Sequence, residues 1–313
     1  MSIEIDPRSA DGWAAVRALL DATERADGAA PVSDQAVAGA AQGHRRVLAF
    51  GEDPGIAPDA VGIVGAGELD LVVRPDARGR GIATAALAEL LTLPEAGGEL
   101  RAWVHGANPA AEALLSAAGF APVRSLHLMT LDPERLPQGS PDPVAPVLAA
   151  GFSAPAADPG DAEQLADWVR VNALAFAGHP EQGAMTAADF ATLAREPWFA
   201  ADDVLLAADG AEPGAPLAGF AWVKTVGRDD GTECELYVLG VDPAHAGRGL
   251  GRALLDAALA RMAAHRPDRV SLYVDGTNDR AIRLYERAGF ALERESRQWL
   301  RSAGPGDTAE NSS

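Results

Sequence analysis

The chain has 313 residues, of which 48% are hydrophobic, and this is enough for two globular domains of ordinary size. Its formal net charge of −19 at pH 7 excludes a protein that tracks nucleic-acid phosphates and favours a small cationic substrate. The single cysteine, Cys234, excludes an internal disulfide or a metal site built from several cysteines, and we expect no metal.

Hydropathy and the first residues predict a cytoplasmic protein. No stretch approaches the roughly 20 apolar residues that a membrane helix needs. The start, MSIEIDPRSA, lacks the basic segment followed by an apolar one that marks a secretory signal. We therefore expect neither a membrane nor a nucleic acid as a partner.

Two blocks in the first half of the chain recur in the second. Residues 72–83 (VVRPDARGRGIA) predict a strand, a Gly/Arg loop and the start of a helix, and residues 102–120 (AWVHGANPAAEALLSAAGF) predict a strand and a helix. They match residues 240–251 (GVDPAHAGRGLG) and 272–290 (LYVDGTNDRAIRLYERAGF) at spacings of 168 and 170 residues. Two blocks at nearly one spacing indicate a duplicated domain.

A segment rich in proline lies between the copies. Residues 131–151, LDPERLPQGSPDPVAPVLAAG, cannot continue a helix or a central strand. We interpret 139–147 as the linker between an N-terminal domain, 1–138, and a C-terminal domain, 148–303. The small, polar tail 304–313 is typical of disorder.

The second half predicts alternating helices and strands, which is typical of an α/β fold. A helix is expected over 160–178, and another after Thr186, which is placed as an N-cap. The runs VLLAAD, LAGFAWVKTV and CELYVLGV predict strands, and GLGRALLDAALARMAAH predicts a long helix. A strand (RVSLYVD), a short helix (DRAIRLYERAG) and a last strand (ALERESRQWLR) follow.

The Gly/Arg loops carry the strongest chemical signal. The helix after each loop begins with N–H groups that have no intrahelical partner, and with the helix dipole they form an anion site suited to a pyrophosphate. An ordinary Gly-rich turn is the alternative, but the loop recurs together with the second block. A Rossmann loop would need GxGxxG, and GRGLGR spaces its glycines differently.

The run Arg78–Ala83 (RGRGIA) resembles the R/Q-x-x-G-x-G/A signature of the GCN5-related N-acetyltransferases, which bind the acetyl-CoA pyrophosphate there. In the second copy the run is Ala246–Gly251 (AGRGLG), where alanine replaces the first Arg or Gln. The resemblance covers both halves. It implies two tandem folds, each a mixed, twisted sheet flanked by helices, with acetyl-CoA bound as co-substrate where the fourth and fifth strands separate.

The same resemblance implies which residues contact acetyl-CoA. They form the end of the fourth strand, the Gly/Arg loop and, in the second copy, the start of the last helix. In the first copy they are Leu71, Val72, Val73, Arg78, Gly79, Arg80, Gly81, Ile82, Ala83 and Thr84. In the second copy they are Leu239, Gly240, Val241, Ala246, Gly247, Arg248, Gly249, Leu250, Gly251, Arg252, Asn278, Asp279, Arg280, Ala281, Ile282 and Arg283.

Two side chains distinguish the copies chemically. Acyl transfer to an amine needs a base for the amine and a proton for the leaving thiolate. At the spacings above, Glu235 corresponds to Gly67, and Tyr285 to Leu115. We therefore expect catalysis by Glu235 and Tyr285 in the second copy, and acetyl-CoA binding without catalysis in the first. A solvated strand glutamate and a half-buried core tyrosine are the alternatives.

Other polar residues of this half are interpreted as structural. Cys234 alternates with Glu235 and so faces the other side of its strand, which makes it core packing and a poor nucleophile. We accordingly expect direct attack of the amine on the thioester. Asp242 and Asp268 are interpreted as turn residues, and His245 and His265, for which the sequence indicates no partner, as surface residues.

The two-copy layout, the stretch HPEQG (179–183) and the only lysine resemble the tandem members of this family that acetylate the cysteinyl amine of a cysteinyl-glucosaminyl-inositol. That resemblance implies acceptor contacts from Asp34, Glu181, Lys224, Glu235 and Tyr273, although the family tends to have glutamate in place of Asp34. Carboxylates suit an ammonium group, and a lysine suits hydroxyls. A surface position at the end of a strand is the alternative for Lys224.

Two further functions remain open. One is an acetyltransferase for another small amine, such as an aminoglycoside, or for a protein N-terminus. The other is a non-catalytic acyl-CoA sensor. We also expect a monomer, because two copies share one chain whereas many single-copy relatives pair.

Overall fold

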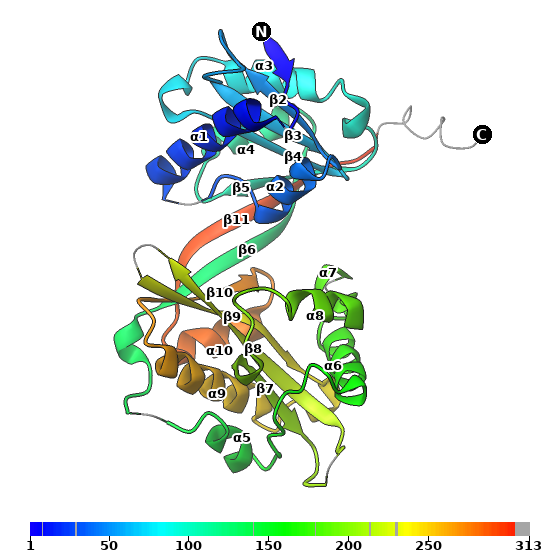
Figure 1. The fold of residues 1–313 in the computed structure, drawn as a ribbon, viewed down its shortest axis with the longest axis vertical. Helices are drawn as coiled ribbons and strands as arrows, with labels where there is room; N and C mark the ends of the chain where they lie inside the picture. The colour runs from blue at the N-terminus through cyan, green and yellow to red at the C-terminus, as the bar shows by residue number, and fades with distance from the viewer. Residues whose placement is uncertain are drawn as a thin grey trace, which may run out of the picture. The chain divides into compact units, whose positions relative to one another are not determined.

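The computed structural model describes residues 1–7, 9–28, 30–139, 141–178, 180–212, 214–228 and 231–303. The chain forms two compact units (Figure 1). Unit 1 comprises Met1–Leu126 and the chain from Arg294 onward, and unit 2 comprises His127–Glu293. The expected tail 304–313 lies outside the described residues.

Unit 1 is a mixed sheet between two layers of helices. Helices α1 (Ala10–Asp27) and α2 (Asp34–Ala41) pack on one face, and α3 (Ile82–Leu90) and α4 (Pro109–Ala117) on the other. The pair β4–β5 is parallel and the other pairs are antiparallel. In sheet order the strands are β1 (Ser2–Glu4), β2 (Arg46–Phe50), β3 (Ala60–Gly65), β4 (Glu68–Val73), β5 (Leu100–His105) and β11 (Ala291–Arg301).

Unit 2 repeats this architecture. Helices α6 (Ala162–Ala175) and α8 (Ala187–Leu193) cover one face, while α5 (Ala145–Ala149), α9 (Leu250–His265) and α10 (Asp279–Ala288) cover the other, and a short α7 (Pro180–Gly183) follows α6. Thr186 caps α8 through a capping box, as its sequence predicts. In sheet order the strands are β6 (Ala121–Leu131), β10 (Arg269–Asp275), β9 (Gly231–Val241), β8 (Leu217–Arg228) and β7 (Val204–Ala208). The predicted strands and helices of this half are confirmed.

The last strand of each sheet differs from expectation. Strand β11 begins in unit 2 but pairs with β5 of unit 1, with Ser296 opposite His105 and Arg301 opposite Leu100. Strand β6 likewise begins in unit 1 and ends in unit 2. The units therefore do not end at the predicted residues 138 and 148, because strand propensity does not specify which sheet a strand joins.

The segment interpreted as a linker packs into unit 2. Leu136, Val147 and Phe152 are buried in the core cluster of that unit, and Val147 lies on α5, which packs against α9. The prolines end regular structure as expected, but the apolar residues between them are enough to anchor the segment. The described residues of the expected linker, 139 and 141–147, are therefore part of unit 2.

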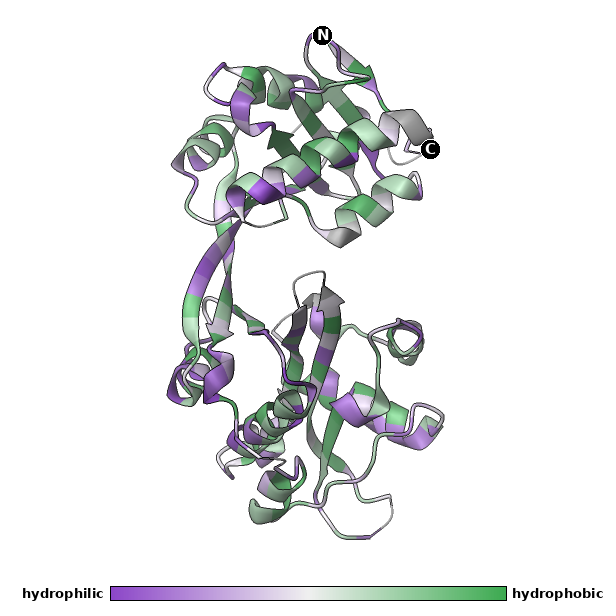
Figure 2. Cartoon of the chain, turned by 60° about the vertical axis from the view of Figure 1, so that its left-hand side comes forward, coloured by the Kyte–Doolittle hydropathy of each residue, from purple (hydrophilic) through white to green (hydrophobic). Residues whose placement is uncertain are grey.

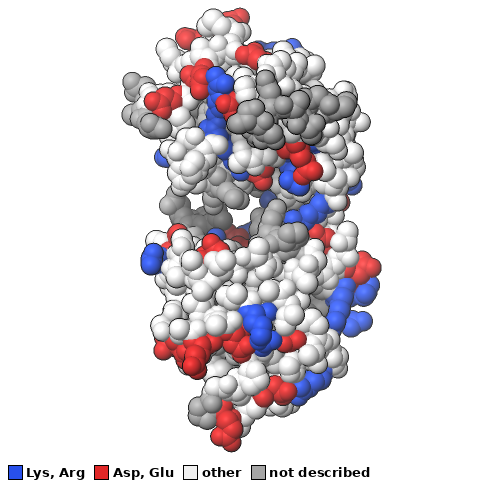
Figure 3. All heavy atoms as spheres, turned by 90° about the vertical axis from the view of Figure 1, so that its right-hand side faces the viewer, with Lys and Arg blue, Asp and Glu red and all other residues white. Residues whose placement is uncertain are grey.

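Strands and helices differ in the distribution of polar and apolar residues. Most strands are predominantly apolar, although β11 is polar over much of its length, and the helices carry both polar and apolar residues (Figure 2). On the face in Figure 3, acidic and basic side chains lie interspersed. Within the described part of the chain, no helix has both the length and the apolar character needed to cross a membrane.

A buried charge cluster in unit 1 predicts a stability effect. Arg45 forms an ion pair with Glu68 and lies 3.3 Å from the Asp70 carboxylate. Burial raises the pKa of Asp70 to about 6, against the attraction of Arg45. An acid whose pKa is higher in the folded state destabilises that state increasingly as pH rises between its unfolded and folded values.

We therefore expect Asp70→Asn to raise the free energy of unfolding at pH 7.5 by about 1–3 kcal/mol, with the gain vanishing near pH 4. Urea unfolding at both pH values measures this difference. A loss of stability at pH 7.5 would show that the Arg45–Asp70 attraction outweighs the burial of the carboxylate.

Candidate active site

The Gly/Arg loop of unit 2 leaves the start of α9 open. Gly247 and Gly249 both have φ +82°, a left-handed conformation that favours glycine. Gly249 is the N-cap of α9, and no described side chain caps the N–H groups of its first turn. The sequence predicts an anion site from these N–H groups together with the helix dipole.

The loop of unit 1 has the same conformation, with φ +74° at Gly79 and +79° at Gly81. Its arginine, Arg78, donates two hydrogen bonds of 2.8 and 2.7 Å to the Asp27 carboxylate at the end of α1. These bonds hold the pKa of Asp27 below its usual value. In unit 2, where Ala246 replaces this arginine, Arg248 pairs instead with Asp209 at 3.2 Å.

A cavity of about 390 Å³ adjoins the loop of unit 1. It lies where β4 and β5 separate, since the two strands pair only at Glu68–Arg101 and Leu69–Ala102 although both continue. Except for Arg80, every acetyl-CoA residue predicted in the first copy lines it, and Leu115 lies on its wall. The structure thus brings the predicted strand end and loop together around one space.

Unit 2 has the same strand separation. Strands β9 and β10 pair from Glu233–Arg269 to Leu236–Leu272, and both continue beyond the last pair. The predicted acetyl-CoA residues lie at the end of β9 and on the segments that follow β9 and β10 in the chain. Leu239–Val241 end β9, Ala246–Gly249 form the loop, Leu250–Arg252 begin α9, and Asn278–Arg283 cap and begin α10.

A β-bulge in β9 separates the two copies. Trp222 of β8 lies opposite Val238 and the next residue, Val223, lies opposite Leu236, so Tyr237 is an extra residue. In unit 1 the corresponding pairing of β3 with β4 runs without a shift from Ala60–Val73 to Gly65–Glu68. Because unit 2 has one more residue here, no single number of residues separates equivalent positions of the two copies on both sides of Tyr237.

This bulge corrects the comparison that pointed to Glu235. Ser271 of β10 lies opposite Glu235, and Arg101, its equivalent 170 residues earlier, lies opposite Glu68. The structural equivalent of Glu235 is therefore Glu68 rather than Gly67. Unit 1 also has a carboxylate here, but Glu68 is bound to the buried Arg45.

Three predicted acceptor residues share one face of the unit 2 sheet. Lys224 and Glu235 lie directly opposite each other on β8 and β9, and Tyr273 lies on β10, 49% exposed. Successive side chains alternate between the faces of a strand, and the neighbours of all three are buried in the core cluster on the α9 side. These neighbours are Val223, Cys234, Leu236, Leu272 and Val274.

Tyr285 lies in α10 and is only 7% exposed, deeper than the half-buried position considered from sequence. Its ring centroid is 6.0 Å from that of Phe290. Burial raises the pKa of Tyr285 to about 12, so the phenol stays protonated at neutral pH. Its equivalent in unit 1, Leu115, lines the cavity of that unit.

Cys234 is core packing, as predicted. It has no exposed surface and lies in the core cluster on the α9 side. Burial raises the pKa of its thiol to about 11. The only thiol of the chain therefore lies on the face opposite Glu235 and stays protonated.

Comparison with known proteins decides the family. The model of the Acetyltransferase (GNAT) family matches residues 32–120 and 168–290. The chain belongs to the GNAT acetyltransferase family. It is similar to proteins named mycothiol acetyltransferase: one from Nocardioides sp. is 42% identical over 91% of this chain and 96% of its own, and one from Kineococcus radiotolerans is 43% identical over 91% of each.

Solved structures agree on the tandem GNAT fold. A tandem GNAT protein from the clavulanic acid biosynthesis pathway has a TM-score of 0.71 at 20% identity, covering 97% of this chain and 99% of its own. A GCN5-related N-acetyltransferase from Sphaerobacter thermophilus has a TM-score of 0.65 at 22% identity, covering 97% and 96%. The expected two-copy fold is thereby confirmed.

The structure explains the last two residues of HPEQG, Gln182 and Gly183, in this GNAT chain. The buried Asn172 of α6 donates a 2.6 Å hydrogen bond to the Gln182 backbone carbonyl and accepts one of 3.2 Å from its side chain. A Cβ on Gly183 would lie 2.6 Å from the Phe176 carbonyl oxygen, so glycine is required. These contacts fix α7, which carries Glu181. The side chains of Glu181 and Asp34, both predicted acceptor contacts, lie outside the described residues.

Two histidines have partners that the sequence did not reveal. His245 lies 3.1 Å from Asp209, and His265 lies 2.7 Å from Asp203, a carboxylate that is 1% exposed. Both carboxylates are distant in sequence, so no local pattern predicts the pairs. The two histidines are half-buried, so the expectation of surface histidines is wrong.

Asp242 and the last helix are as expected. Asp242 accepts a 2.9 Å hydrogen bond from the Ala244 N–H and so caps the turn after β9. Asp268 instead accepts a bond of 2.8 Å from the N–H of Thr232 on β9, so its carboxylate joins two segments that are distant in sequence rather than closing a local turn. Asn278 caps α10 by accepting a 3.0 Å bond from the Ala281 N–H, as Asn108 caps α4. The Asn278 side chain therefore shapes the helix start.

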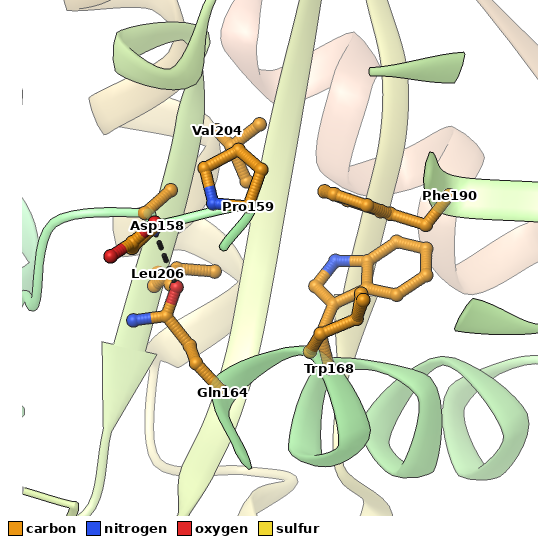
Figure 4. Close-up of a pocket in the computed structure, with 9 residues that line it drawn as sticks. Asp158, Pro159, Gln164, Trp168, Phe190, Val204 and Leu206 are labelled. Carbon is orange, nitrogen blue, oxygen red and sulfur yellow. Dashed lines mark hydrogen bonds between the residues drawn. The ribbon is translucent and has the colours of Figure 1, made fainter. Parts of the chain in front are cut away.

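A small cavity of about 20 Å³ lies beside α6, away from the Gly/Arg loop (Figure 4). Gln164 closes one side of it by accepting a 2.8 Å hydrogen bond from the Asp158 N–H. Trp168 and Phe190 form the opposite wall. Its volume suits a single water molecule and no substrate.

Proposed function

We propose that this protein transfers the acetyl group of acetyl-CoA to the cysteinyl amine of a cysteinyl-glucosaminyl-inositol, giving mycothiol and CoA. It is an N-acetyltransferase of the mycothiol synthase type, as its resemblance implied. The observation that carries this function is 42–43% identity to mycothiol acetyltransferases across about nine tenths of the chain.

We place the chemistry in unit 2. Acetyl-CoA supplies the activated thioester, and GNAT family membership supports its use. The uncapped N–H groups at Gly249 and the start of α9 suit its pyrophosphate. Backbone N–H groups near Leu239, at the separated end of β9, are suited to stabilising negative charge on the carbonyl oxygen.

In this proposal Glu235 and Tyr285 carry out the two proton transfers of the reaction. Glu235 accepts a proton from the acceptor amine, directly or through a water molecule, as the nitrogen bonds to the carbonyl carbon. Tyr285 gives its phenolic proton to the sulfur as the C–S bond breaks. An α-amino group with a pKa of about 7.7–8.0 is partly neutral near pH 7, so the base has a modest task.

We propose that unit 1 binds acetyl-CoA without turning it over. Its cavity and loop suit the cofactor. Its carboxylate Glu68 is bound to Arg45, and Leu115 stands where unit 2 has Tyr285. At the positions equivalent to Glu235 and Tyr285, unit 1 thus has a carboxylate held by a buried arginine and a side chain without a proton to give.

Mass spectrometry of the products tests the function. With acetyl-CoA and the cysteinyl-glucosaminyl-inositol acceptor, we expect an acceptor heavier by one acetyl group and an equal amount of CoA. Preference for an aminoglycoside or a peptide N-terminus in the same assay would assign another acetyltransferase. Binding of acetyl-CoA without turnover of any amine would assign a sensor.

Direct attack of the acceptor amine on the thioester predicts that the thiol of Cys234 takes no part in the reaction. We expect Cys234 in the native protein to react with a disulfide reagent at least about 100-fold more slowly than after unfolding, because the thiol is buried and protonated. Cys234→Ala should change kcat less than about twofold. An inactive variant, or an acetylated Cys234 trapped after mixing with acetyl-CoA, would contradict direct attack.

We also propose a cytoplasmic monomer that works without a metal. Acetyl-CoA and a thiol product both fit the cytoplasm, and two copies in one chain remove the need for a paired subunit. Sedimentation at micromolar concentration is expected to give a mass near 32.3 kDa. A stable species of twice that mass would contradict the monomer.

A further inference from the structure

The only lysine of the chain, Lys224, lies against two neighbouring aromatic rings. Its Nζ atom is 5.1 Å from the ring centroid of Trp198 and 5.6 Å from that of Tyr237. The two rings are 5.5 Å apart. Both distances from the ammonium fall within the range of a cation–π interaction.

The rings of Trp198 and Tyr237 both pack on a buried tryptophan, Trp222. Trp222 has no exposed surface and contacts Trp198 at 5.6 Å and Tyr237 at 5.4 Å between centroids. Phe190 of α8 packs on Trp222 at 5.3 Å. The aromatic side chains that face Lys224 therefore rest on a closely packed core and have little freedom to move.

The arrangement exists because of the bulge. Tyr237 is the extra residue of β9, and it lies on the sheet face of Lys224 and Glu235. In unit 1 the pairing has no extra residue, and the equivalent of Lys224 is Gly65. The aromatic pair is thus specific to the unit that we assign to catalysis.

We propose that Trp198 and Tyr237 are positioning residues that fix the Lys224 ammonium for hydroxyl groups of the acceptor's sugar–cyclitol part. A lysine side chain has many rotamers, and the two rings restrict them before the acceptor binds. The ammonium has three donors, and Glu235 lies directly opposite on the next strand. Lysine then holds the polyol end of the acceptor while the carboxylate receives its amine. This inference rests on the proposed function.

Steady-state kinetics tests the arrangement. We expect Trp198→Leu and Tyr237→Leu each to raise the acceptor KM about 3- to 30-fold, with kcat and the acetyl-CoA KM within about twofold of wild type. Lys224→Met should raise the acceptor KM similarly, and adding Trp198→Leu to it should cost little more. Phe199→Leu is the matched control, because Phe199 also packs on Trp222, at 5.6 Å, without approaching Lys224 in the described contacts.

Additive effects of Trp198→Leu and Lys224→Met on the acceptor KM would overturn the proposal, as would a Trp198→Leu variant that keeps the wild-type KM. An equal rise in Phe199→Leu would assign the effect to general packing and overturn it as well.

A second measurement does not depend on turnover. Because the chain has one lysine, reductive ¹³C-methylation labels only Lys224 and the N-terminal amine. We expect the Lys224 methyl signal of the native protein to be shifted upfield by the two rings, to move toward the unfolded value in Trp198→Leu, and to stay shifted in Tyr237→Phe. A native signal at the unfolded position would overturn the proposal that the two rings position Lys224. If the wild-type protein fails to acetylate the acceptor but this shift is present, the proposed function fails and the positioning of Lys224 by the rings stands.

Discussion

Replacing Tyr285 by phenylalanine is expected to lower kcat by about 10²–10⁴-fold while acetyl-CoA binding stays nearly unchanged. The variant keeps the ring that packs on Phe290 and removes only the proton that the leaving thiolate needs. Because burial raises the pKa of Tyr285 to about 12, the wild-type rate should show no alkaline loss from this group below about pH 11. Single-turnover rates across pH 6–10 measure both effects.

Glu235→Gln should lower kcat by a similar factor, because an amide cannot accept the amine proton. The matched control is Glu68→Gln in unit 1. It should keep kcat but lower thermal stability, since Arg45 loses its closest partner. A wild-type kcat for Tyr285→Phe at every pH would assign the tyrosine to the core, and a wild-type kcat for Glu235→Gln would return the glutamate to a solvated face.

The second large effect concerns the glycines of the two loops. Gly249→Val is expected to abolish turnover, because φ +82° is strongly unfavourable for a β-branched residue and the loop must change shape at the pyrophosphate site. Gly81→Val has the same strain at φ +79° but lies in unit 1, so it should keep turnover and lose one of two acetyl-CoA equivalents. Neither glycine has an atom within 4 Å of an added Cβ, so the comparison tests conformation rather than a clash.

Isothermal titration with CoA gives the stoichiometry of each variant, and the acceptor assay gives its rate. Full activity in Gly249→Val with none in Gly81→Val would reverse the assignment of the units. Two bound equivalents in both variants would show that the loops do not hold the pyrophosphate.

Much of the site could be predicted because its signals are local. The loops RGRGIA and AGRGLG require left-handed φ values, and the glycines that favour such values are visible in the sequence itself. Strand alternation likewise placed Cys234 in the core and Glu235 on the other face.

The remaining features depend on contacts distant in sequence. A bulge is specified by the pairing of two strands, so Tyr237 could not be recognised as an extra residue, and Glu235 was matched to Gly67 rather than Glu68. The contacts of His245 and His265 with aspartates, and the aromatic ring of Trp198 beside Lys224, likewise join segments with no shared local pattern. Residue 67 is a glycine, but the residue that occupies the place of Glu235 in the sheet is Glu68.

The pairing of β11 with β5 determines how long the edge of β5 stays unpaired during synthesis. Strand β5 is synthesised by residue 105, but the strand that covers its free edge ends only at residue 301. At about 5–20 residues per second, roughly 10–40 s separate the two on the ribosome. Throughout that interval the nascent chain presents an unpaired edge, which other strands can join. A gene cut between the halves would make this exposure permanent, so the first half alone is expected to be insoluble even though it contains a complete cofactor loop.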